Sequence, residues 1–79
     1  MRVIIFRECG KGRDFRIETE MPFPPCKGMM IQLKEHGTVV TVSGVKYICE
    51  SNAMLVFTEG RATDSDVLMM QKEGGWIRE

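Results

Sequence analysis

The sequence carries no net charge, no long apolar run and few aromatic side chains. Its 79 residues include eleven basic and eleven acidic groups, so no overall field draws the protein to nucleic acid or to an anionic membrane. No apolar run approaches the roughly 18–20 residues that span a bilayer. The run Val3 to Phe6 is also shorter than the roughly 7–15 apolar residues of a signal peptide. These absences predict a cytoplasmic protein that does not enter the membrane.

Cysteine and histidine are scarce, with three and one respectively. An odd number of cysteines argues against a disulfide-stapled scaffold. Zinc sites normally begin with closely spaced ligand pairs, whereas Cys9, Cys26, His36 and Cys49 lie far apart in the chain. His36 precedes Gly37 in a predicted turn, and no nucleophile motif is present. We therefore predict no catalytic residue, no metal and no cofactor, and a protein that is not an enzyme.

What the sequence does contain is strand-like alternation of apolar and polar residues. Hydrophobic residues make up 43% and charged residues 28%, a globular balance, and the length allows a single domain over residues 1–79. The glycines at 10 and 12 predict a hairpin turn, and the prolines of 22–28 predict a connector. Strands are predicted at 3–6, 14–21, 29–34, 38–50 and 53–58.

Two details of these strands bear on the architecture. Segment 38–50 is either one bent strand or two strands broken at Ser43-Gly44, because a glycine inside a strand pattern marks a bulge or bend. Segments 3–6 and 53–58 are apolar on both faces, so each needs cover on two sides. We therefore expect these two strands side by side at the centre of a curled sheet.

The C-terminal part predicts one short helix. Residues 63–66 offer N-cap side chains and negative charge at the helix start, residues 67–73 have helical composition, and Gly74 suits a C-cap. Trp76 is expected to fold back on the body, and the helix with Trp76 to cover part of the outward sheet face. The predicted fold is α+β: a curled antiparallel sheet or small SH3-like half-barrel of five to six strands with one short C-terminal helix.

Protein interaction is the function class that the pattern favours. One short helix cannot cover every outward apolar residue, so we expect a homodimer or another protein partner. Adjacent methionine pairs place Met30 and Met69 away from the core, and flexible thioethers suit contact surfaces. Phe23 stands between prolines on a stiff loop, which lowers the entropy cost of binding. The predicted partner-binding residues are Phe23, Met30, Met69 and Trp76.

The alternative is a small barrel that binds single-stranded nucleic acid through a basic groove and stacking aromatics. Its candidate residues surround the first hairpin: Arg7, Lys11, Arg13 and Arg16. The aromatics nearby are predicted to belong to the sheet and its core rather than to an exposed row, so this alternative is not favoured. The flanking strands also exclude a phosphate-binding P-loop at residues 10–13.

The order of these features resembles a loose group of proteins. The features are a glycine-turned hairpin, a Pro/Gly connector into Gly28-Met29-Met30-Ile31-Gln32-Leu33, a bent valine-rich strand and a Gly74-Gly75-Trp76 ending. Together they resemble the short, functionally unassigned β-rich proteins carried by phages and integron gene cassettes. The resemblance implies an accessory interaction protein of mobile DNA, and it transfers no catalytic or binding residue.

Overall fold

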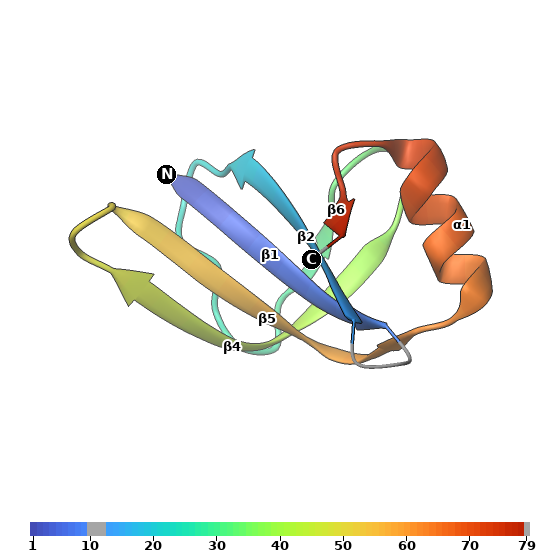
Figure 1. Cartoon of the computed structure of the whole chain (residues 1–79). Helices are drawn as coiled ribbons and strands as arrows, with labels where there is room; N and C mark the ends of the chain where they lie inside the picture. The colour runs from blue at the N-terminus through green and yellow to red at the C-terminus, as the bar shows by residue number, and fades with distance from the viewer. Residues whose placement is uncertain (10–12, 79) are drawn as a thin grey trace.

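The computed structural model of the chain describes residues 1–9 and 13–78. Within these residues, a six-stranded sheet in the order β3-β4-β5-β1-β2-β6 curls into a half-barrel with one helix at its end (Figure 1). The predicted α+β half-barrel is thus confirmed. The elements are β1 (Arg2–Cys9), β2 (Arg13–Glu20), β3 (Met30–Gln32), β4 (Val39–Ile48), β5 (Ala53–Ala62), α1 (Asp64–Glu73) and β6 (Ile77–Arg78).

The two strands that are apolar on both faces lie side by side at the centre of the sheet, as expected. Val3 of β1 is in register with Met54 of β5, and Ile5 with Val56. The prediction of an antiparallel sheet fails at this one pairing, because β1 and β5 run parallel. Each successive strand of the chain from β1 to β5 reverses direction, so the fifth runs the same way as the first. The alternation of apolar and polar residues shows which face of the sheet each side chain lies on, but it does not show whether two neighbouring strands run parallel or antiparallel.

Segment 38–50 forms one bent strand rather than two. The register between β4 and β5 shifts between Val42 and Gly44, which is the bulge that the Ser43-Gly44 pair suggested. Before the bulge β4 pairs with β3, and after it β4 continues beside β5 toward the far hairpin (Figure 1). The bend therefore lets one strand serve both sides of the half-barrel.

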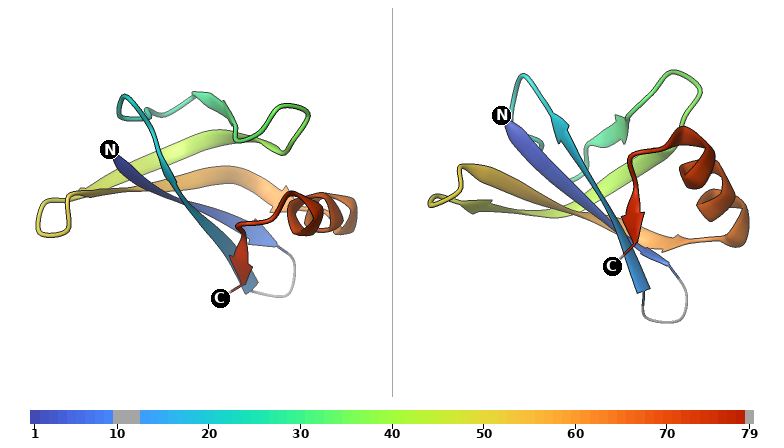
Figure 2. Two further views of the ribbon diagram at one scale, coloured as in Figure 1. Left: turned by 90° about the horizontal axis from the view of Figure 1, so that it is seen from above. Right: turned by 45° about the horizontal axis from the view of Figure 1, so that its top comes forward.

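The core lies on the inner side of the curled sheet. The connector from β2 to β3 crosses behind the central strands (Figure 2), and Met21 and Met29 at its two ends pack against the core. The buried cluster consists of Val3, Ile5, Ile17, Ile31, Val40, Val42, Met54 and Val56. The hairpin of β1 and β2 is confirmed by its register from Arg2↔Glu20 to Cys9↔Arg13, while its glycine turn at 10–12 lies outside the described residues.

The helix begins at the predicted cap. The Thr63 hydroxyl accepts a hydrogen bond from the Asp66 backbone N–H at 3.2 Å. The Asp66 carboxylate accepts one from the Thr63 backbone N–H at 2.8 Å. This capping box satisfies N–H groups that the first helical turn leaves without partners. Gly74 ends the helix with a positive φ.

The helix covers the inner side of the sheet, not the outward face, which corrects the sequence-based expectation. Met70 is fully buried in a second cluster with Cys9, Phe15 and Ala62. Cys9 and Phe15 belong to the same strand faces as the buried Ile5 and Ile17, so this cluster extends the core toward one end. The buried side of the helix is narrow, since Leu68 is exposed and Met70 is the buried residue of α1.

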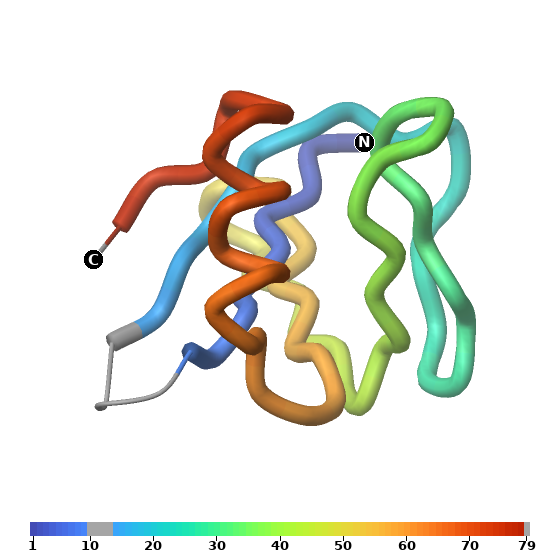
Figure 3. The backbone as a smooth tube through the Cα atoms, turned by 90° about the vertical axis from the view of Figure 1, so that its right-hand side faces the viewer, coloured from blue at the N-terminus to red at the C-terminus, as the bar shows by residue number. Residues whose placement is uncertain are grey.

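Glu73, the last residue of α1, connects the helix by hydrogen bonds to the segment between β3 and β4, which lies across the half-barrel from the helix (Figure 3). One of its carboxylate oxygens accepts a hydrogen bond from the Thr38 backbone N–H at 3.2 Å. The other accepts from the Trp76 indole N–H, also at 3.2 Å. Lys34 donates to the Glu73 backbone carbonyl. These contacts hold α1 and Trp76 over the inner side, so the outward face of β1 and β5 stays uncovered by the helix.

Candidate functional site

The outward face of the two central strands carries an apolar strip. Ile4 is in register with Leu55, and Phe6 with Phe57; these positions alternate with the buried ones. The rings of Phe6 and Phe57 stack with centroids 5.8 Å apart and planes 15° apart. Ile77 of β6 extends the strip beyond β2. We call Ile4, Phe6, Leu55, Phe57 and Ile77 the outer strip, in which Phe57 is 42% and Ile77 57% exposed.

A bulge fixes the position of the aromatic pair. The register of β1 with β5 shifts between Phe6 and Glu8, which interrupts the regular ladder of backbone hydrogen bonds. The Thr58 hydroxyl donates to the Phe6 carbonyl at 2.9 Å. The Thr58 side chain thus supplies a hydrogen bond between the two strands where the backbone ladder is irregular. Because Thr58 directly follows Phe57, this bond holds the strands together beside the stacked rings.

Two hollows flank the outer strip, and they are lined by different charged residues. The larger has a volume of about 400 Å³ and is lined by Phe6, Glu8, Asp14, Phe57 and Thr58. The smaller, of about 220 Å³, is lined by Arg2, Ile4, Arg16, Glu18 and Ile77.

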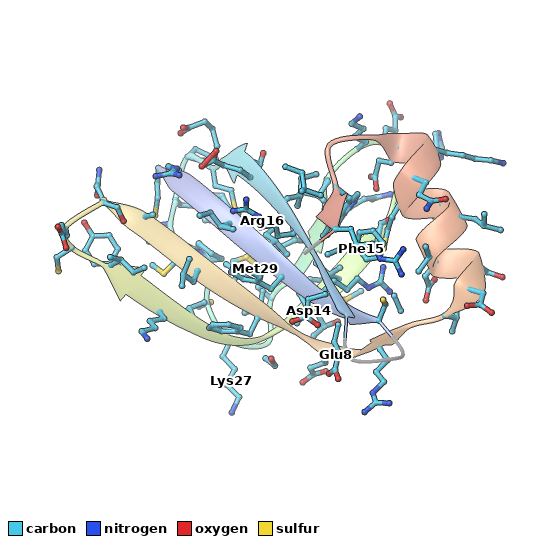
Figure 4. The ribbon with its side chains drawn as sticks, in the orientation of Figure 1. Glu8, Asp14, Phe15, Arg16, Lys27 and Met29 are labelled. Atoms are coloured by element: carbon cyan, nitrogen blue, oxygen red, sulfur yellow. The ribbon has the colours of Figure 1, made fainter. Side chains whose placement is uncertain are left out.

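The charges at the two hollows differ in sign. Glu8 and Asp14 are paired across β1 and β2 and lie together beside the first hollow (Figure 4), with Arg61 at 3.4 Å from Glu8. Arg2 and Arg16 line the second hollow, where Arg2 forms an ion pair with Glu18. The outward face therefore has an acidic end with Glu8 and Asp14. At the other end, which we call the basic end, Arg2 and Arg16 lie beside Glu18 and Glu20, and apolar side chains lie between the two ends.

The predicted partner-binding residues lie on different elements. Phe23 is exposed on the connector, Met30 on the outward side of β3 and Met69 on α1. Trp76 is half-buried, packs against both core clusters and donates its indole N–H to Glu73, so it supports the fold. The outward orientation predicted for Met30 and Met69 is confirmed.

Sequence reasoning missed the outer strip as a site. The pattern did mark segments 3–6 and 53–58 as apolar on both faces. It assigned part of the outward face to the helix and the remainder to a protein partner, but it did not single out Phe6, Leu55 or Phe57 as the contact. The strip is uncovered because Met70 packs into the core cluster on the inner side of the sheet and so holds the helix on that side.

Of the basic residues suggested for nucleic-acid binding, the two whose side chains the structure describes, Arg7 and Arg16, lie on opposite faces of the sheet. The Arg7 side chain is only 12% exposed and lies 3.3 Å from the Asp66 carboxylate and 3.6 Å from the Met70 sulfur. It joins β1 to α1 on the inner side, whereas Arg16 lies on the outward face with the second hollow. Lys11 and the side chain of Arg13 lie outside the described residues. The arginine at position 7 has a structural role.

Asp66 makes the stability of the helix depend on pH. Its pKa is lowered, chiefly by the hydrogen bond from the Thr63 backbone and also by the Thr63 hydroxyl and Arg7, against the opposing effect of burial. The carboxylate therefore stabilises the folded state above its ordinary pKa of 3.8, and this contribution is lost as the pH falls through the lower folded-state value.

We expect Asp66→Asn to lower the free energy of unfolding at neutral pH by about 0.5 kcal/mol, the usual contribution of an exposed charge at a helix N-terminus. The difference between wild type and variant should shrink as the pH is lowered below 3.8. Urea unfolding followed by circular dichroism at neutral and acid pH measures it. Equal differences at both pH values would contradict the role given to the carboxylate.

The described residues contain no group of three or more His, Cys, Asp or Glu side chains placed to hold a metal ion. His36 is exposed in its turn with a positive φ. Cys9 is buried, and Cys26 and Cys49 are exposed. Within the same residues, no helix has both the length and the apolar character needed to cross a membrane.

Comparison of the chain with protein-family models, with curated proteins and with solved structures finds no match. The resemblance to short β-rich proteins of phages and gene cassettes therefore stays a prediction. The function has to be argued from the outer strip itself.

Proposed function

We propose that this chain is a small non-enzymatic binding module that pairs with a second copy of itself through the outward face of its sheet. The observation that carries the proposal is the outer strip, which crosses both central strands and includes the stacked rings of Phe6 and Phe57. Large aromatic side chains at the centre of a face, ringed by charged groups, are the usual composition of an interface.

The charges favour a second copy as the partner. Two sheets can stack face to face about a two-fold axis that lies between them and runs across the strands, between Ile4 and Phe6. This axis brings the acidic end of each copy over the basic end of the other. Glu8 then faces the partner's Arg2. Two-fold interfaces are self-complementary in this way, and the zero net charge of the chain adds no repulsion between copies.

The second strand of the face agrees with the same axis. Arg16 of β2 then lies opposite Glu18 of the other copy. The remaining pair, Asp14 and Glu20, brings like charges to the rim, where the N-terminal ammonium group lies 3.2 Å from the Glu20 carboxylate. A standard interface covers about 800 Å² of each partner, and the chain exposes 5260 Å².

Sedimentation equilibrium tests the proposal. We expect the wild-type chain to approach twice its mass of 9.0 kDa as its concentration rises through the micromolar range. A single species of 9.0 kDa throughout that range would sink the proposal.

A charge exchange tests the arrangement of the two copies. Glu8→Arg and Arg2→Glu each place like charges opposite one another, so each variant alone should dimerise about tenfold more weakly. An equal mixture should recover the wild-type affinity, because in the heterodimer Arg at position 8 meets Glu at position 2 at one end and the native Arg2 meets the native Glu8 at the other. Sedimentation of the variants, singly and mixed, measures this.

Glu50→Arg, in the turn between β4 and β5, is the matched control and should leave association unchanged. A mixture no tighter than the separate variants would contradict this orientation, while a wild-type dimer would still support the outer strip as the interface.

A further inference from the structure

The second half of β4 is an open edge of the sheet. Residues 39–41 of β4 pair with β3, and the last contact on that side is at Val42, which exchanges hydrogen bonds with Met29 and Gly28. From Ser43 to Ile48, the pairings of the described residues involve β5 alone. Every second residue of this stretch therefore directs its backbone N–H and C=O away from the sheet. We call Ser43–Ile48 the β4 edge.

The side chains of the β4 edge show that a neighbouring strand would complete the core. Val45 is in register with the buried Val56, and Tyr47 with the buried Met54. Both therefore belong to the inner side, yet Val45 is 41% and Tyr47 45% exposed. They are exposed because β3 ends beside the first half of β4. An added strand in line with β3, paired with the second half of β4, would cover both side chains.

The charge at this edge decides between possible occupants. Lys46 is exposed on the outward side of the β4 edge, in register with Leu55. Lys27 projects past β4 from the connector (Figure 4). If two copies paired edge to edge about Lys46, the two Lys46 side chains would lie opposite each other, and like charges in direct opposition are destabilising. A strand with acidic residues on its outward side would instead meet both lysines favourably.

We propose that the β4 edge binds an extended segment of another protein as an added strand, and that this segment alternates apolar residues with acidic ones. Backbone hydrogen bonds supply affinity in such strand addition, and side chains on alternate positions supply specificity. The apolar residues of the segment pack beside Val45 and Tyr47, and its acidic residues lie beside Lys46. This site uses the β4 edge, which adjoins the outer strip where Lys46 is in register with Leu55, and it does not require the chain to dimerise.

Three seven-residue peptides with blocked ends test the proposal by NMR titration of the full chain. One alternates valine with glutamate, the second alternates valine with lysine, and the third is the glutamate peptide with N-methyl groups on alternate residues. We expect the first to bind, with amide shifts centred on residues 43–48. The lysine peptide should bind at least tenfold more weakly, and N-methylation should abolish binding because it removes the donors of the ladder.

Lys46→Glu should weaken binding of the glutamate peptide at least tenfold, whereas Lys72→Glu on the exposed side of α1 should not. Absence of binding by the glutamate peptide, binding that survives N-methylation, or equal effects of the two lysine variants would each overturn the proposal. None of these outcomes bears on dimerisation, which is measured separately by sedimentation.

Discussion

Phe57→Glu should abolish self-association while leaving the chain folded. The Phe57 ring stands at the centre of the outer strip, stacked on Phe6 and 42% exposed in the single chain. A carboxylate here remains hydrated in the monomer but must lose its water in the dimer, where it faces the apolar side chain of Leu55 in the other copy. We expect dimerisation to weaken about 100-fold, which corresponds to about 2.7 kcal/mol. Sedimentation equilibrium measures the association, and circular dichroism checks the fold.

Phe23→Glu is the matched control, because Phe23 is equally an exposed aromatic but lies on the connector rather than on the outer strip. It should leave the dimer unchanged. If Phe23→Glu disrupts association and Phe57→Glu does not, the interface lies on the connector, as the sequence alone had suggested, and the outer strip is excluded.

Met70→Ala should be the most destabilising single truncation of the helix. Met70 is fully buried among Cys9, Phe15 and Ala62, and it is the one buried residue of α1. Its removal leaves a cavity at the only deep contact of the helix and also takes away the sulfur beside Arg7. Truncation of a buried methionine costs about 2–5 kcal/mol, a large share of the stability of a small domain. Urea unfolding measures the loss.

The neighbouring residue supplies the control for this prediction. Met69 has the same side chain on the same helix but is largely exposed, so Met69→Ala should change the free energy of unfolding by no more than about 0.5 kcal/mol. Similar losses for the two variants would show that the helix packs against the sheet through a different face.

Much of the architecture could be read from local patterns. The two-faced strands 3–6 and 53–58 predicted the centre of the sheet, and the Ser43-Gly44 pair indicated the bend in β4. The capping residues predicted the helix start, and the alternation within each methionine pair gave the outward direction of Met30 and Met69. These features are recorded in neighbouring residues, because side-chain direction in a strand and hydrogen bonding at a cap are local properties.

The side of the sheet that the helix covers could not be read in the same way. It depends on Met70 meeting Cys9 and Phe15, and on Glu73 meeting Thr38, which are contacts between segments far apart in the chain. The same long-range packing places Arg7, a candidate nucleic-acid contact, on the inner side beside Asp66, where its side chain is 12% exposed. It also left Phe6 and Phe57 uncovered by the helix, and so defined the candidate site.

An isotope-filtered NOE experiment on a mixture of labelled and unlabelled chains tests directly whether two copies pair through the outer strip. We expect intermolecular cross-peaks between the rings of Phe6 and Phe57 and the methyl groups of Ile4 and Leu55. These contacts arise because the outward faces of β1 and β5 stack on one another in the dimer. Cross-peaks confined to Phe23, Met30 or Met69, or no intermolecular cross-peaks from the outer strip at concentrations where sedimentation finds a dimer, would contradict this pairing.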